Sequence, residues 1–339
     1  MKALVWKGPY DLRVEEVAKP HIGSDEVLVQ VIYNGICGTD MTIQKGGHPR
    51  AKSPLILGHE IVGRIVEIKS RHHRLRLGDR VAVRPLINCG TCLACRSGQS
   101  HVCRNLRLPG VDFNGGCAEY LKVPFSILHR IPENAKDEEV ALVEPLAVAI
   151  HAISRIHLPT KKAKILIQGA GPIGTLIGLM LRYQGNRKVT ISDISQFRLE
   201  IAKKIGLHPL DASDPNFKSN AHNLASPEGF DILLEASGSK SSALNITDLL
   251  RVQGTAVIVG VHSEPVPVDL TQIAFKELTL IGSRVYTTRD FEKAIRLAST
   301  NRLGLRKLVT HIISLHESPK GFDAMADTNS SLKVLIKCS

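Results

Sequence analysis

The sequence predicts an α/β protein that joins a β-rich region to a doubly wound parallel sheet. Short runs rich in valine and isoleucine, separated by glycine turns, recur through residues 1–147. From Lys164 onward, short apolar runs alternate with segments of helical character, and a glycine-rich loop follows the first of those runs. A length of 339 residues suits two domains better than one.

The β-rich region is expected to include both ends of the chain. Its strands are predicted from β-branched runs and its one helix from apolar spacing. The expected strands are Val27–Tyr33, Ile61–Ile68, Arg80–Arg84, Leu308–Ile313 and Leu332–Lys337, and the expected helix is Arg289–Ser299. We expect the C-terminal segment to rejoin the N-terminal region, so that residues 1–147 and 286–339 form one discontinuous domain.

The second region, residues 148–285, alternates strands with helices. The expected strands are Ile165–Gln168, Lys188–Ser192, Phe230–Ala236, Thr255–Gly260 and Glu277–Ile281, and the first two helices end near Tyr183 and Ile205. Strands and helices that alternate at this spacing indicate a parallel sheet built from right-handed crossovers.

Composition excludes several classes of protein. Hydrophobic content of 43% fits a globular chain, and no apolar run is long enough to span a membrane. The N-terminus lacks the apolar core of a signal peptide, so a cytoplasmic location is expected. The net charge of +12 is spread along the chain, with its densest run at Arg71–Arg76, which we interpret as a solvated loop. Only 4% of residues are aromatic, so base stacking and nucleic-acid binding are not expected.

The glycine-rich loop has the pattern G-x-G-x-x-G. It consists of Gly169, Ala170, Gly171, Pro172, Ile173 and Gly174. In this pattern the first glycine permits the tight turn, the second lets a pyrophosphate approach the main chain, and the third lets the helix pack on the strand. The N–H groups at the start of the following helix favour phosphate. The strand before and the helix after the loop give the motif the context of a dinucleotide site.

Asp193 stands at the end of the next expected strand, where a carboxylate accepts hydrogen bonds from the ribose hydroxyls. A carboxylate there repels a 2′-phosphate, so NAD is expected in preference to NADP. Arg198 lies close by in the sequence and is a second expected cofactor contact, although an arginine can also pair with a phosphate.

Four cysteines lie close together and indicate a metal site. They are Cys89, Cys92, Cys95 and Cys103. In a reducing compartment such a group is typical of metal binding and not of disulfides. Four thiolates close a tetrahedral shell around zinc and leave no open position, which is the pattern of a structural site. An iron–sulfur cluster is the alternative, because close Cys-x-x-Cys spacing also serves those clusters.

A second set of possible metal ligands is dispersed along the sequence. Cys37, His59 and Glu60 follow glycines near expected strands, and Glu144 follows later. Together they offer sulfur, nitrogen and oxygen ligands. Three protein ligands plus a water or substrate is the catalytic zinc pattern.

Several motifs together resemble one known family. G-I-C-G-T-D from Gly35, G-H-E-I-V-G from Gly58, the four-cysteine group, E-P-L-A-V from Glu144 and G-A-G-P-I-G from Gly169 appear in that order. They resemble the zinc-dependent medium-chain dehydrogenase/reductase (alcohol dehydrogenase) family, over essentially the whole chain. E-P-L-A-V is similar to the branch of sorbitol and other polyol dehydrogenases, butanediol dehydrogenase and threonine dehydrogenase. The family implies a β-rich GroES-like catalytic domain and a Rossmann cofactor domain at residues 148–285.

The resemblance also implies roles for individual residues. Cys37 and His59 would bind the catalytic zinc, with Glu60 and Glu144 filling the remaining role in an order that stays open. Thr39 would take the substrate proton. Related enzymes usually carry a histidine where this chain has Thr42.

The segment around Val261 and Ser283 would lie near the nicotinamide, and Arg284 near the substrate. The implied cofactors are NAD and two zinc ions per chain, one catalytic and one structural, in a homodimer or homotetramer without membrane or nucleic-acid partners.

The expected function is zinc-dependent, NAD-linked oxidation of a secondary alcohol in a polyol or sugar-derived substrate to the ketone. L-Threonine and vicinal diols are the alternative substrates. A metal-free relative is disfavoured by Cys37, His59 and Glu60, and a non-catalytic cofactor-binding sensor is the alternative outside enzymes.

Overall fold

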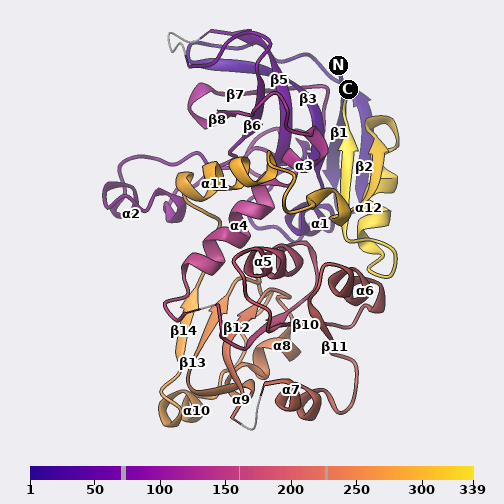
Figure 1. Ribbon diagram of the computed structural model, residues 1–339. Coiled ribbons are helices and arrows are strands. Elements are labelled where there is room, and N and C mark those ends of the chain that lie inside the picture. Colours follow the sequence, from indigo (N-terminus) through magenta and orange to yellow (C-terminus); the bar gives the residue numbers. More distant parts are fainter. Residues whose placement is uncertain (70–73, 160, 226–227) are drawn as a thin grey trace. The chain divides into compact units, whose positions relative to one another are not determined.

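The computed structural model describes residues 1–69, 74–159, 161–225 and 228–339. It divides the chain into two compact units (Figure 1). Unit 1 comprises Met1–Glu144 and Thr287–Ser339, and unit 2 comprises Pro145–Tyr286. Half of the basic run Arg71–Arg76 lies outside the described residues.

Unit 1 is built on two β-sheets. The larger runs in the order β15-β16-β3-β5-β6-β8, with β7 also paired to β3, and the smaller runs β2-β1-β4. The strands are β1 Lys2–Gly8, β2 Asp11–Glu16, β3 Glu26–Gly35, β4 Leu55–Ile56, β5 Glu60–Ile68, β6 Arg80–Val83, β7 Tyr120–Pro124, β8 Leu128–Arg130, β15 Val309–Ser314 and β16 Lys333–Lys337. The C-terminal strand β16 pairs antiparallel with β3, with Leu335 opposite Gly35. Both ends of the chain therefore contribute to one sheet.

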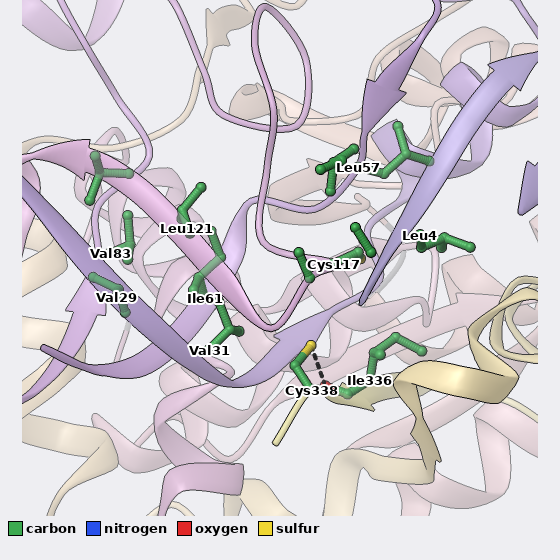
Figure 2. Close-up of a cluster of buried hydrophobic side chains, with 14 of the residues drawn as sticks. Leu4, Val29, Val31, Leu57, Ile61, Val83, Cys117, Leu121, Ile336 and Cys338 are labelled. Atoms are coloured by element: carbon green, nitrogen blue, oxygen red, sulfur yellow. Dashed lines mark hydrogen bonds between the residues drawn. The ribbon is translucent and has the colours of Figure 1, made fainter. Parts of the chain in front are cut away.

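The core of unit 1 is formed by side chains from both sheets. Figure 2 shows Val29 and Val31 of β3, Ile61 of β5 and Ile336 of β16 in one buried cluster. Cys117 belongs to the same cluster and is fully buried, as expected for a small apolar residue. Alternate residues of each strand point into this cluster, which fixes the strand register.

Short helices complete unit 1. The α-helices are α1 Gly38–Gln44, α2 Leu93–Arg96, α3 Asp137–Val140, α11 Thr288–Ala298 and α12 Ser318–Ala326, and α4 Val143–Ser154 begins here and continues into unit 2. The 3-10 turns are η1 Ser100–Val102, η2 Phe125–Ile127, η3 Leu305–Leu308 and η4 Leu315–Glu317. A capping box starts α11, because Thr287 and Asp290 bond to each other's backbone N–H groups. Within the described ranges, no helix is long and apolar enough to cross a bilayer.

Unit 2 is one parallel six-stranded sheet in the order β11-β10-β9-β12-β13-β14. Its strands are β9 Ile165–Gln168, β10 Val189–Asp193, β11 His208–Asp211, β12 Phe230–Glu235, β13 Leu250–Ile258 and β14 Thr279–Gly282. The intervening helices are α5 Pro172–Tyr183, α6 Gln196–Lys204, α7 Phe217–Ala225, α8 Lys240–Leu244, α9 Ile246–Leu249 and α10 Leu270–Phe275. This strand order is that of the doubly wound fold, with its switch point beside β9.

Two expected strands of unit 2 have different bounds. β13 begins at Leu250, five residues before the expected start, and β14 begins at Thr279 instead of Glu277. Glu277 has a φ of +49° and lies in the turn that leaves α10, so it cannot continue an extended strand.

Candidate active site

Strand pairing brings Cys37, His59 and Glu60 together. Cys37 lies two residues beyond the end of β3, and Glu60 begins β5. These strands are antiparallel neighbours in which Gly35 lies opposite Glu60. Their potential ligand atoms all lie within 4.8 Å of one another. A thiol, an imidazole and a carboxylate at this separation fit the mixed ligand set of a catalytic metal site.

Asp40 ties these ligands to the local backbone. Cys37 is the N-cap of α1, and its N–H donates to Asp40 Oδ2 at 2.9 Å. The N–H of Gly58 donates to Asp40 Oδ1 at 3.3 Å, and His59 Nδ1 lies 3.7 Å from that same oxygen. Burial acts to lower the pKa of His59, but the charges of Asp40 and Cys37 outweigh it and hold the pKa well above its ordinary value. The imidazole is thus oriented by a buried carboxylate, as metal-binding histidines commonly are.

Glu144 and Thr39 lie on the helices that flank the trio. Glu144 is buried in the first turn of α4, and its charge contributes to the raised pKa of His59. It is not one of the three residues whose ligand atoms cluster within 4.8 Å. Thr39 is half-buried in the first turn of α1. Thr42 points elsewhere, since its hydroxyl donates to the Gly38 carbonyl at 3.1 Å.

The sequence gave no indication that Lys333 belongs to this site. The side chain of Lys333 is buried, with 1% of the residue exposed, at the start of β16. Its Nζ donates to the Ile36 carbonyl at 2.8 Å and forms an ion pair with Glu60 Oε2. In the sequence it stands in a run of alternating charged and apolar residues that would equally suit an exposed strand edge.

The four cysteines of the second group form a compact tetrad. The Sγ–Sγ separations are 3.5 Å for Cys92–Cys95 and Cys89–Cys103, and 3.9 Å for Cys89–Cys95 and Cys92–Cys103. A tetrahedron with Zn–S bonds of about 2.3 Å has edges of about 3.8 Å. The tetrad therefore fits a single tetrahedral ion, whereas a cluster of several irons holds its thiolates farther apart.

Backbone N–H groups stabilise thiolates in this tetrad. The N–H of Cys89 donates to Cys103 Sγ at 3.3 Å, and that of Cys92 donates to Cys89 Sγ at 3.4 Å. The N–H groups of Cys92 and Thr91 lower the pKa of Cys89 to about 5. The surrounding lobe has little core, since α2 has no buried residue and Leu93 is 74% exposed.

The glycine loop of unit 2 has three distinct steric environments. Gly169 has a φ of +102°, and a Cβ there would meet the backbone of Ser237. A Cβ on Gly174 would overlap the Gly169 carbonyl, so the helix can approach the strand only without a side chain there. A Cβ on Gly171 would meet only Arg198 Nη1, at 3.8 Å. Gly171 is the N-cap of α5 and Pro172 its first residue, with Ile173 next, so a phosphate could approach free N–H groups at this point.

Asp193 ends β10 beside this loop. Its Oδ2 accepts from the Ala170 N–H at 2.7 Å, and its Oδ1 accepts from the Ser195 N–H at 2.9 Å. Each oxygen keeps a lone pair for a ribose hydroxyl. Burial lowers the pKa of Arg198, and the charge of Asp193 opposes that effect. Asp193 and Arg198 thus border the open space at Gly171.

A polar cluster that sequence reasoning missed lies at the carboxyl ends of β9, β12 and β13. Glu235 accepts from the N–H groups of Ser237 and Gly238 at 2.9 Å, and His262 Nε2 lies 3.3 Å from Glu235 Oε2. Gln168 is fully buried at the end of β9. These residues are 27 to 67 positions apart in sequence, so no local pattern links them.

The three residues expected near the nicotinamide and substrate lie on loops after β13 and β14. Val261 is 92% exposed, and Arg284 is also exposed. The backbone N–H of Ser283 donates to the Ile258 carbonyl at 2.9 Å. All three therefore follow the carboxyl ends of neighbouring parallel strands, where ligands bind in doubly wound folds.

Two family models match the chain. An alcohol dehydrogenase GroES-like domain model matches residues 23–133, and a zinc-binding dehydrogenase model matches residues 172–300. With the two kinds of sheet, these matches confirm the predicted fold class.

Known proteins resemble the chain over its whole length. An L-threonine 3-dehydrogenase from Shewanella putrefaciens is 33% identical over 99% of both chains. The structure of an alcohol dehydrogenase from E. coli CFT073 complexed with NADH is 30% identical, with a TM-score of 0.92 and 99% coverage of both chains. Galactitol-1-phosphate dehydrogenase from Escherichia coli is 29% identical, with a TM-score of 0.89, covering 99% of this chain and all of its own.

Proposed function

We propose that this chain, which belongs to the zinc-dependent medium-chain alcohol dehydrogenase family, oxidises a secondary hydroxyl of a polyol or sugar-derived substrate to the ketone with NAD. The observation that carries the proposal is the convergence of Cys37, His59 and Glu60 within 4.8 Å, beside a buried aspartate. Buried thiol, imidazole and carboxylate groups have no packing reason to converge, whereas a catalytic zinc requires such a set.

In this proposal Cys37 and His59 hold the catalytic zinc together with a carboxylate from Glu60 or Glu144. When bound, zinc supplies a Lewis acid that makes an alcohol oxygen easier to deprotonate near neutral pH. Asp40 orients the imidazole of His59 through the contact at 3.7 Å. Thr39, on the first turn of α1, is positioned to take the proton of the substrate hydroxyl. The tetrad Cys89, Cys92, Cys95 and Cys103 holds a second, structural zinc.

NAD supplies the hydride acceptor. Gly169, Gly171 and Gly174 give the pyrophosphate access to the N-terminus of α5, while Asp193 takes the adenosine ribose. The nicotinamide half then lies over the later strands, near Val261 and Ser283.

Asp193→Ser is expected to shift cofactor preference from NAD toward NADP. The carboxylate accepts from the ribose and repels a 2′-phosphate, whereas the neighbouring Arg198 can pair with that phosphate. We expect the ratio of kcat/KM for NAD to kcat/KM for NADP to fall about a hundredfold, or about 2.7 kcal/mol. Steady-state kinetics with both cofactors measures it. An unchanged ratio would place the ribose elsewhere.

Substrate choice is proposed from two observations. Glu144 lies in an E-P-L-A-V segment similar to that of polyol dehydrogenases, and its charge reaches His59. A galactitol-1-phosphate dehydrogenase is among the similar structures. Arg284 is exposed after β14 and is proposed to bind a hydroxyl or an anionic group of the substrate. The second candidate is L-threonine, favoured by 33% identity to an L-threonine 3-dehydrogenase.

A substrate panel tests this proposal. NADH formation would be followed with polyols, polyol phosphates, sugar acids, vicinal diols and L-threonine. The proposal predicts the highest kcat/KM on a polyol or sugar-derived member. A highest value on L-threonine would replace it with the second candidate.

The open edge of unit 2 is proposed to form a homo-oligomer interface through strand β14. β14 is the last strand of its sheet, and an unpaired edge invites a second copy. On the adjoining α10, Leu270 and Phe275 are 75% and 84% exposed.

Phe275→Asp is expected to convert the oligomer to a monomer, because it would place a charge in the apolar contact. Light scattering after size exclusion measures the mass, and Tyr10→Asp, at another exposed aromatic, is the matched control. A wild-type chain that is already monomeric would contradict this interface.

A further inference from the structure

Lys333 and Glu60 form a buried ion pair beside the candidate metal ligands. The side chains of both residues are 2% exposed. Lys333 Nζ makes its second contact with the Ile36 carbonyl at 2.8 Å, so two oxygens from the β3 and β5 region hold the ammonium in place. A buried lysine is rare unless it is paired, and here its partner is a potential metal ligand.

The space for this pair is provided by Gly35. A Cβ at Gly35 would lie 3.1 Å from both Glu60 Cδ and Lys333 Cε. Gly35 lies directly opposite Glu60 in the β3–β5 ladder and opposite Leu335 in the β3–β16 ladder. Strand pairing from two distant parts of the chain thus places the ammonium beside the carboxylate.

The ammonium and a metal ion would compete for the same carboxylate. Glu60 is one of the three residues whose ligand atoms lie within 4.8 Å of one another, so its side chain can reach an ion held by Cys37 and His59. An ionised carboxylate without Lys333 would have the metal as its only strong positive partner at this depth.

We propose that Lys333 is a positioning residue that restrains Glu60 and so keeps one coordination position of the catalytic zinc open for substrate. This inference rests on the proposed function, because it concerns the metal of that same site. It also assigns Glu144, and not Glu60, as the third protein ligand. Closed shells are structural and open shells catalytic, so the ion pair selects the catalytic form of the site.

Lys333→Met tests this assignment through metal release. The rate of zinc transfer to a chromophoric chelator would be measured for wild type, Lys333→Met and Lys333→Arg. Lys337→Met, on the exposed end of the same strand, is the matched control. The release phase of the catalytic zinc is identified as the phase that Cys37→Ser abolishes, which separates it from the four-cysteine zinc.

The expected result has an unusual sign. In Lys333→Met the freed Glu60 closes the shell, so catalytic zinc is released about tenfold more slowly while kcat falls about tenfold or more. Lys333→Arg keeps the charge and stays closer to wild type than Lys333→Met in both readouts. The visible spectrum of the cobalt-substituted protein reports the added ligand. Faster or unchanged zinc release in Lys333→Met would overturn the proposal, because a merely structural lysine would loosen the site.

A double variant covers the case in which Lys333→Met folds poorly. Lys333→Met combined with Glu60→Gln removes both charges, so no unpaired ion is buried. The proposal predicts that the double variant releases zinc at least as fast as wild type. Slow release in the double variant would contradict it. These readouts require no turnover, so a wrong substrate assignment and a wrong role for Lys333 give separate results.

Discussion

Cys37→Ser should abolish alcohol oxidation and leave the chain folded. The thiolate is the only sulfur ligand of the proposed catalytic site, and serine is a poor zinc ligand at neutral pH. We expect kcat/KM to fall about a thousandfold or more, equivalent to about 4 kcal/mol of transition-state stabilisation. Zinc content should fall from two ions per chain to one. NADH affinity should stay within a few-fold, because the cofactor residues lie in unit 2.

The matched control for this variant is Cys117→Ala. Cys117 is fully buried in the core of the same unit, and it accepts from Asn34 Nδ2 at 3.1 Å instead of joining either metal set. Its loss should reduce stability and leave kcat near wild type. If Cys37→Ser retained both zinc ions and its activity, the assignment of the catalytic site would be wrong.

Cys92→Ser should remove the structural zinc and destabilise the lobe around it. The tetrad has no other cohesion, because α2 buries no side chain and the ligand contacts are the main links within residues 89–103. Structural zinc binding contributes directly to folding, so we expect a loss of several kcal/mol in the free energy of unfolding. Urea unfolding measures it, and rapid tryptic cleavage at Arg96 or Arg104 would show that the lobe has opened.

Ser97→Ala is the control within the same lobe. Ser97 donates to the Ala94 carbonyl at 3.1 Å and is exposed, so its removal should change stability by less than about 1 kcal/mol. Equal stability of Cys92→Ser and wild type, with two zinc ions still bound, would contradict a structural tetrad.

Local motifs explain which parts of the fold and site were accessible from the sequence. The glycine loop spans six residues, and its surroundings in β9 and α5 follow directly from neighbouring residues. The cysteine tetrad is similarly local, and its spacing alone predicted a metal site. The β-rich unit was only partly predicted. β1 and β2 were missed because their short runs mix charged with apolar residues, and their pairing with each other is what makes them strands.

Nonlocal contacts explain what was missed. Lys333 lies 273 positions after Glu60, and only the pairing of β16 with β3 brings the two together. His262 meets Glu235 for the same reason, through parallel β12 and β13. A charged residue in an apolar strand can be exposed or paired, and the sequence near it does not distinguish these cases.

The central claim is that alcohol oxidation by NAD depends on zinc held by Cys37 and His59. The most direct test is to measure NADH formation from the best panel substrate after catalytic zinc has been removed by a chelator, and again after zinc is restored. The account predicts that turnover disappears with the catalytic ion and returns with it, while NADH remains bound throughout. Undiminished turnover in protein that lacks this ion would contradict the account.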